Sequence, residues 1–212
     1  MTSPAERARF VREQLPSGGL FADQHWRIAP EPFVLGAELA KEFETLGRVL
    51  LQFYRAVNLL YRRSVDGKQP EWVSTWLDQG KPAGLVALQR APILRHELPR
   101  VIRPDCLLTE NGIAITELDS VPGGIGLTAW LNETYAAAGA PVLGGPRGMV
   151  EGFASIFEPA DNVHIIVSEE SATYRPEMEW LAGKLGRKKK IQNTTDSPKV
   201  KPSTVFSSYS TS

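Results

Sequence analysis

The sequence predicts an α+β protein in which a helical N-terminal region packs on a β-hairpin. Three observations favour this class. Asn111-Gly112 separates two short apolar segments, and Asn-Gly is the strongest short-range hairpin signal in a sequence. Apolar residues recur every three or four positions from Leu35 to Arg63, as in a long amphipathic helix. A β-branched apolar run at 162–167 precedes another helical pattern, which predicts a buried parallel strand followed by a helix.

Composition and charge limit the function classes. The chain has 212 residues, of which 42% are hydrophobic, so it can bury a sizeable core. Lys plus Arg and Asp plus Glu number 24 each, so the net charge indicates neither a nucleic acid nor an anionic membrane as partner. Cys106 is the single cysteine, which excludes an internal disulfide and favours a reducing compartment. We expect Cys106 to be a small buried residue of a strand rather than a nucleophile.

The N-terminal region is predicted to be helical, and the protein is expected to be soluble and cytoplasmic. Ser3-Pro4 supplies a cap and a first-turn proline for a helix that ends near Pro16. This segment is charged and lacks the apolar core of a secretion signal, and no apolar run approaches the ~20 residues that span a bilayer. The long helix at 35–63 is expected to turn one apolar face to the core: Leu39, Phe43, Leu46, Leu50, Phe53, Val57 and Leu60.

Two shorter helices are predicted between the long helix and the hairpin. The first begins at Pro70 and reaches Gly80, and we expect its apolar stripe to pack against neighbouring helices. That stripe consists of Trp72, Val73, Trp76 and Leu77. The second runs from 82 to 89.

Acidic residues gather in the predicted hairpin. Side chains alternate along the strand at 113–119, so Glu117 and Asp119 point the same way, about 6–7 Å apart at Cα. Asp105 on the partner strand can reach the same end of the hairpin, beside Arg103. Three carboxylates beside an arginine predict a site for a divalent metal ion and a phosphate. The alternative is that these acids only end their strands and that Arg103 pairs with Asp105.

The spacing of these residues resembles the closing segment of ATP-grasp carboxylate–amine ligases, the family of D-alanine–D-alanine ligase. That family has R-x-D, about a dozen residues, E-x-N and then P-G. The matching positions here are Arg103, Asp105, Glu117, Asp119 and Pro122-Gly123-Gly124, with Thr128 beyond them. Asp119 stands where the family usually has Asn, which keeps an oxygen ligand and adds a negative charge.

The resemblance implies a reaction and a set of roles. A carboxylate would be activated by ATP as an acyl phosphate, which an amine would then attack, so small-molecule carboxylate and amine substrates are implied. Asp105, Glu117 and Asp119 would hold Mg²⁺, and Arg103 would steady the transferred phosphoryl group. Backbone amides of the segment Gly123, Gly124 to Thr128, which leads into a helix, would bind the substrate carboxylate or a phosphate.

The position of this motif in the middle of the chain is similar to circularly permuted ATP-grasp proteins, whose relatives include glutathionylspermidine synthase. In them a Rossmann-like domain follows the metal-ligand strands. Four regions are accordingly expected: a helical region with the hairpin at 1–138, a Gly/Pro linker at 139–148, an incomplete Rossmann-like β-α start at 149–186, and a disordered, basic, Ser/Thr-rich tail at 187–212.

The abrupt change after Gly186 suggests a truncated or frame-shifted chain that lacks a C-terminal ATP-binding part. The chain alone is therefore not expected to turn over ATP. Two alternatives remain: a non-catalytic binding or scaffold module, and a nucleic-acid-binding protein that acts through the basic tail. The tail has five positive residues between Lys184 and Lys190 but no aromatic stacking pattern, so a nucleic-acid partner is the less expected of the two.

Overall fold

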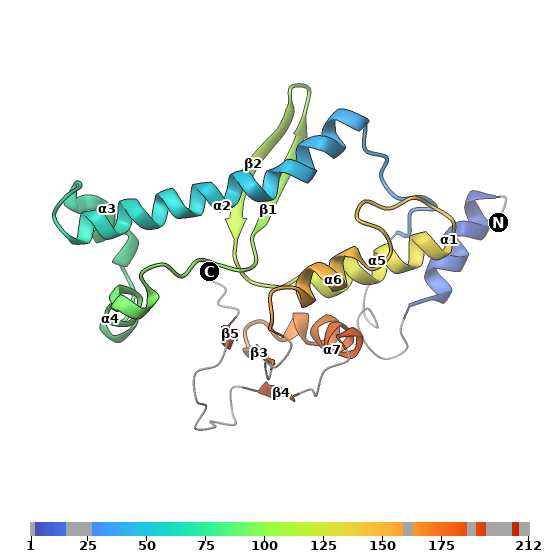
Figure 1. Cartoon of the computed structure of the whole chain (residues 1–212). Helices are drawn as coiled ribbons and strands as arrows, with labels where there is room; N and C mark the ends of the chain where they lie inside the picture. Colours follow the sequence, from blue (N-terminus) through green and yellow to red (C-terminus); the bar gives the residue numbers. More distant parts are fainter. Residues whose placement is uncertain (1–2, 16–26, 159–162, 186–189, 194–204, 208–212) are drawn as a thin grey trace. The chain divides into compact units, whose positions relative to one another are not determined.

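The chain forms two compact units with a mixed α and β structure, as expected for the coarse fold class. The computed structural model describes residues 3–15, 27–158, 163–185, 190–193 and 205–207 (Figure 1). One unit is the continuous segment 36–118, and the other combines residues 1–35 with 119–212. The sequence predicted a first region ending at 138, so the structure divides the chain differently.

The first unit to be described is residues 36–118. Its helices are α2 (Ala37–Val65), α3 (Glu71–Asp78), α4 (Ala83–Arg90) and the 3₁₀ helix η1 (Pro92–Leu94), and its strands are β1 (Arg103–Thr109) and β2 (Gly112–Asp119), of which β2 ends one residue beyond the unit. β1 and β2 pair as a small two-stranded sheet.

Buried serines join α2 to α3. The Ser64 hydroxyl donates to the Pro70 carbonyl at 2.6 Å and accepts from the Ser74 amide at 3.0 Å. Both serines are almost fully buried, at 3% and 5% exposure, so these bonds satisfy polar groups that water does not reach. They hold the start of α3 against the last turns of α2.

The predicted core face of α2 is only partly right. Leu50 is buried, but Phe53 is 53% exposed and Leu60 is 40% exposed. The buried side of the C-terminal half instead carries Tyr61 and Ser64. The hydroxyls of Tyr61 and Ser64 bond to polar groups of α3 and α4. A search for apolar residues at helical spacing does not detect a buried helix face that carries hydroxyls.

The predicted stripe of α3 is also corrected. Val73 and Ser74 are the buried residues of this helix. Trp72 and Trp76 are 64% and 72% exposed, and Leu77 is 44% exposed. The two buried residues are consecutive, so only one narrow side of this short helix contacts α2, and the large apolar residues beside it are left outside.

The other unit is built around α5 (Ile125–Ala137). Its remaining elements are α1 (Pro4–Glu13), α6 (Gly148–Ala154), η2 (Ala172–Tyr174), α7 (Arg175–Lys184), β3 (His164–Val167), β4 (Lys190–Asn193) and β5 (Val205–Ser207). α5 packs against both α6 and α7 (Figure 1). Val11 of α1 and Trp130 of α5 form a core cluster, and the Trp130 indole donates to the Gln14 carbonyl at 3.3 Å.

The start of α1 agrees with the sequence prediction. The Ser3 hydroxyl accepts from the Glu6 amide at 3.2 Å, and the Glu6 carboxylate accepts from the Ser3 amide at 3.0 Å. This is a reciprocal capping box, and Pro4 occupies the first turn.

A three-stranded parallel sheet has β3 at its centre. The strand order is β4-β3-β5, with Ile165 opposite both Ile191 and Phe206. Ile165 and Val167 are 5% and 2% exposed, which confirms the predicted buried strand. The tail was expected to be disordered, but 190–193 and 205–207 are strands that flank β3; the rest of 187–212 lies outside the described residues. The sequence did not predict β4 and β5 as parallel neighbours of β3, because the residues after Gly186 show no apolar periodicity.

Candidate functional site at the hairpin and the following helix

The hairpin forms where it was predicted, with its turn one residue earlier. Glu110 and Asn111 make the turn, and Gly112 begins β2 with a φ of +106°. The Thr109 hydroxyl accepts from the Asn111 amide at 3.2 Å and donates to the Gly112 carbonyl at 3.0 Å. A two-residue turn followed by a glycine of positive φ is typical of a hairpin with a bulge at that glycine.

Two of the predicted metal ligands lie across the hairpin from one another. Asp105 is on β1 and Glu117 is on β2, and both side chains are exposed. The Thr116 hydroxyl donates to the Asp105 carbonyl at 3.2 Å. Because Thr116 directly precedes Glu117, Asp105 and Glu117 lie at nearly the same height along the two paired strands. Arg103 is half-buried at the first position of β1.

The third predicted ligand, Asp119, ends β2. One of its carboxylate oxygens accepts from the Ser120 amide at 2.6 Å and from the Val121 amide at 3.0 Å. This short-range pattern turns the chain out of the strand. Within the described ranges, no group of three His, Cys, Asp or Glu side chains is placed so that it could hold a metal ion.

The amides predicted to bind a substrate anion already have an internal partner. Gly124 caps the start of α5 with a φ of +84°, and its amide donates to the Glu177 carboxylate of α7. The Leu127 amide donates to the other oxygen of Glu177 at 2.8 Å. The Thr128 hydroxyl bonds back to the Gly124 carbonyl at 2.9 Å. An external carboxylate or phosphate would therefore have to displace Glu177 from these two amides.

Glu177 is a capping residue that the sequence did not indicate. It is 6% exposed, and a carboxylate at a helix N-terminus is favoured by both the free amides and the helix dipole. A sequence signal for such a pairing would have to relate α7 to the start of α5, some fifty residues earlier. The contact instead depends on how the two helices pack.

Neighbouring groups approach closely at two glycines near the start of α5. A Cβ atom built on Gly126 would lie 2.3 Å from the Glu177 carbonyl oxygen. A Cβ atom on Gly123 would lie 2.8 Å from the Tyr174 ring. At Gly126 the close atom is a backbone oxygen, so a larger residue does not fit there without a shift of α7.

A second polar cluster lies in residues 36–118, where α2, α3 and α4 meet. The Tyr61 hydroxyl donates to Asp78 at 2.9 Å, and the Gln89 amide donates to the Tyr61 oxygen at 2.7 Å. Arg90 forms an ion pair with Asp78. Burial by itself raises the pKa of Asp78, but the hydrogen bonds from Tyr61 and Arg90 and the charges of Arg90 and Lys81 outweigh it, so the pKa of this carboxyl lies below its usual value.

Cys106 of β1 is not activated. Burial, followed by the neighbouring charge of Asp105, raises the pKa of its thiol above the usual value. A raised pKa keeps the thiol protonated at neutral pH, and the thiolate is the nucleophilic form. Cys106 is half-buried rather than buried as expected, and its raised pKa favours a structural role over that of a nucleophile.

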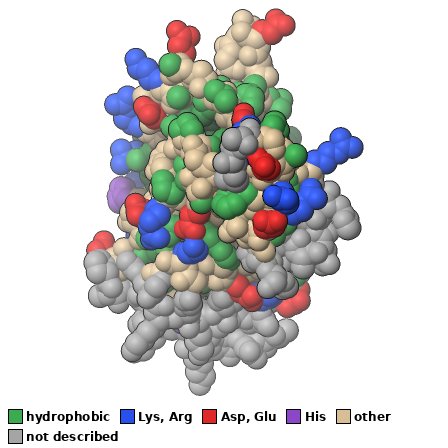
Figure 2. All heavy atoms as spheres, turned by 90° about the vertical axis from the view of Figure 1, so that its right-hand side faces the viewer, with side chains coloured by type: hydrophobic (Ala, Val, Ile, Leu, Met, Phe, Trp, Pro, Cys, Tyr) green, Lys and Arg blue, Asp and Glu red, His purple; other side chains and the backbone are tan. Residues whose placement is uncertain are grey.

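Neither the surface charge nor the comparisons with known proteins indicate a function for the hairpin. Figure 2 shows acidic and basic side chains interspersed over the face it draws. No helix in the described part of the chain has the length and apolar character needed to cross a bilayer.

No protein-family model, curated protein or solved structure matches the chain. The basic tail proposed for nucleic-acid binding lies largely outside the described residues.

Proposed function

We propose that the β1–β2 hairpin is the magnesium- and phosphate-binding element of a carboxylate–amine ligase that uses ATP. The observation that carries the proposal is the pair Asp105 and Glu117, exposed on neighbouring strands at nearly the same level. Among the described residues, neither carboxylate has a hydrogen bond or an ion pair. Their oxygens therefore remain available to a ligand.

The donor set fits Mg²⁺. This ion is commonly held by one or two carboxylates together with phosphate oxygens and water, so a cluster of three protein ligands is not required. Asp105 and Glu117 would hold the ion, and Asp119 would end the strand and keep Glu117 in place through its bonds to Ser120 and Val121. When bound, Mg²⁺ would neutralise phosphate charge and orient the nucleotide.

Arg103 is proposed to bind the transferred phosphoryl group. Its guanidinium is always charged and presents paired donors that suit phosphate oxygens. Its half-buried position on β1, two residues before Asp105, suits a fixed cation that faces a phosphate held by the hairpin. We also propose that the rest of the nucleotide and the amine bind to parts beyond the described residues, and that the hairpin by itself holds Mg²⁺ with the nucleotide phosphates at millimolar concentrations.

The test uses the full chain and Mg²⁺ together with a non-hydrolysable ATP analogue. A ligand that binds only the folded state raises the melting temperature, so we expect a rise with Mg²⁺ and the analogue that EDTA abolishes. The rise should be lost in Asp105→Asn and in Glu117→Gln. Glu110→Gln, in the exposed turn of the same hairpin, is the matched control and should keep it.

Two results would contradict the proposal. One is a melting temperature that does not respond to Mg²⁺ with the analogue at millimolar concentrations. The other is a response that persists unchanged in Asp105→Asn and Glu117→Gln, because the nucleotide would then bind elsewhere. Mn²⁺, a paramagnetic substitute for Mg²⁺, gives an independent reading by broadening amide signals of β1 and β2 in NMR spectra.

A further inference from the structure

A cavity of about 460 Å³ lies within residues 36–118, apart from any role of the hairpin. Its wall is formed by α2, the end of α3, Gln89 of α4 and the segment from Leu94 to Pro99. The volume lies in the range of small-molecule sites, which run from about 300 to 1,000 Å³. Just over half of the lining residues are apolar or aromatic: Tyr54, Val57, Tyr61, Leu77, Leu94, Leu98 and Pro99.

Arg62 brings a positive charge to this apolar wall. One Nη atom donates to the Leu94 carbonyl at 3.0 Å, while the Nε atom is buried and has no hydrogen-bond partner. No carboxylate of the described residues forms an ion pair with Arg62. A half-buried cation without a counter-ion is costly, and an anion in the cavity would offset that cost.

The neighbouring charges do not supply this counter-ion. Asp78 is engaged by Tyr61 and Arg90. Glu97 lines the cavity with an exposed side chain, and Lys81, also exposed, lies on the same lining and bonds to Gln89 at 3.3 Å. Both side chains are exposed to water, and neither forms an ion pair with the other, so the half-buried charge on the wall is that of Arg62.

The wall opposite α2 is held in place before any ligand binds. The Asn58 side-chain amide donates to the Arg95 carbonyl at 3.0 Å, one turn of α2 before the bond from Arg62 to the Leu94 carbonyl. These two bonds fix the segment after η1 against α2. A pre-formed wall lowers the ordering cost of binding.

We propose that this cavity binds a small organic acid with an apolar body, of the class of medium-chain or aryl carboxylates. The carboxylate binds the Arg62 guanidinium, and the apolar body lies against Val57, Leu94 and Leu98. The site uses none of the hairpin residues, so it stands or falls independently of the proposed ligase function.

The first experiment compares two probes on the wild-type chain. Octanoate and octanamide share the apolar chain and differ in charge. We expect octanoate to bind at least about tenfold more tightly, because a hydrogen bond to a charged group is worth more than one between neutral groups. Titration calorimetry gives the affinities, and shifts of the Asn58 and Gln89 side-chain amide signals in NMR spectra locate the probe.

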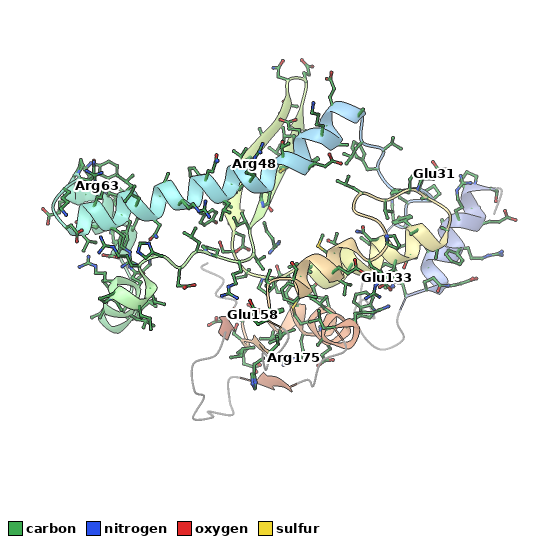
Figure 3. All side chains as sticks on the ribbon, viewed as in Figure 1. Glu31, Arg48, Arg63, Glu133, Glu158 and Arg175 are labelled. Atoms are coloured by element: carbon green, nitrogen blue, oxygen red, sulfur yellow. The ribbon has the colours of Figure 1, made fainter. Side chains whose placement is uncertain are left out.

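The second experiment uses neighbouring arginines as a matched pair. Arg62→Met should abolish the preference for octanoate over octanamide while octanamide still binds, which shows that the cavity persists. Arg63→Met should leave both affinities unchanged, since Arg63 is exposed at the C-terminal end of α2 (Figure 3) and does not line the cavity. Arg62→Lys, which keeps the charge, should retain part of the preference.

The proposal is overturned if octanoate does not bind at millimolar concentrations, or if octanamide binds the wild type equally well. It is also overturned if Arg62→Met and Arg63→Met weaken octanoate equally, because the effect would then be one of overall charge. Octanoate binding that leaves the Asn58 and Gln89 signals unmoved would place the ligand elsewhere and contradict it too.

Discussion

Asp78 shows how a single carboxylate organises residues 36–118. It accepts hydrogen bonds from Tyr61 and Gln89 and pairs with Arg90, so it links three helices. Its side chain is only 12% exposed, which shields these bonds from water. Hydrogen bonding to Tyr61, and then to Asp78, also raises the pKa of Arg90, so both partners of the pair stay charged.

We predict that Asp78→Asn lowers the free energy of unfolding by about 1–3 kcal/mol at neutral pH, since a hydrogen-bonded charge is lost. The folded pKa of Asp78 lies below its ordinary value of 3.8. Its contribution is therefore complete above the unfolded pKa and is lost as pH falls through the folded pKa. Urea unfolding at several pH values should show the wild-type and Asp78→Asn stabilities converging in acid.

The control for this prediction is Asp66→Asn. Asp66 is 44% exposed and lies 4.0 Å from Lys68, and such exposed pairs contribute little. Asp66→Asn should change stability by less than about 0.5 kcal/mol. A gap between wild type and Asp78→Asn that stays constant down to strongly acid pH would contradict the assigned role of the Asp78 charge.

At the scale of elements, α5 and α7 are joined by a close contact. The buried Glu177 carboxylate caps the start of α5, and Gly126 lies against the backbone of Glu177 itself. Lys184 of α7 forms an ion pair with Glu133 of α5. Figure 3 labels Glu133. The joint therefore combines a helix cap, a close backbone approach and an ion pair.

We predict that Gly126→Ala lowers the free energy of unfolding by about 1–3 kcal/mol, as overpacking of a tight contact does. The added Cβ would meet the Glu177 carbonyl oxygen at 2.3 Å, and a backbone atom cannot move aside as a side chain can. Thermal or urea unfolding measures the loss. The matched control is Gly152→Ala in α6, where no atom lies within 4 Å of the added Cβ.

Gly152→Ala should leave stability unchanged or raise it by up to about 1 kcal/mol, because alanine favours a helix over glycine. Equal effects of the two substitutions would mean that α5 and α7 do not approach as closely as the structure has them.

The helices and strands also show which features could be predicted from the sequence and which could not. Signals that act over a few residues were sufficient: the capping box of Ser3 and Glu6 and the hairpin turn beside Gly112 both form. Contacts between distant elements were not foreseen, because Glu177 reaches amides about fifty positions earlier. The exposure of Trp76 was missed for a related reason, since an apolar period shows which side chains share a face but not whether another element covers that face.

At the scale of the whole molecule, the division into two units was not evident from composition. Residues 36–118 form an insertion between two parts of the other unit. Proline and glycine do lie near both boundaries, at 30–36 and 122–124, but these stretches were interpreted as turns within one region. The second boundary falls one residue before the end of β2. The predicted Mg²⁺ ligands therefore come from both sides of a boundary, with Asp105 and Glu117 on one side and Asp119 on the other.

The division predicts that the two units lose stability separately. Hydrogen exchange in the native state reports local opening free energies, and a substitution should raise exchange mainly in the unit that it weakens. Gly126→Ala should accelerate amides of α5 and α7 and leave those of α3 and α4 near wild-type rates. Asp78→Asn should do the reverse. If either substitution accelerates both sets of amides equally, the units open as one cooperative body, and a ligand in the cavity beside Arg62 would then also protect the amides of α5 and α7.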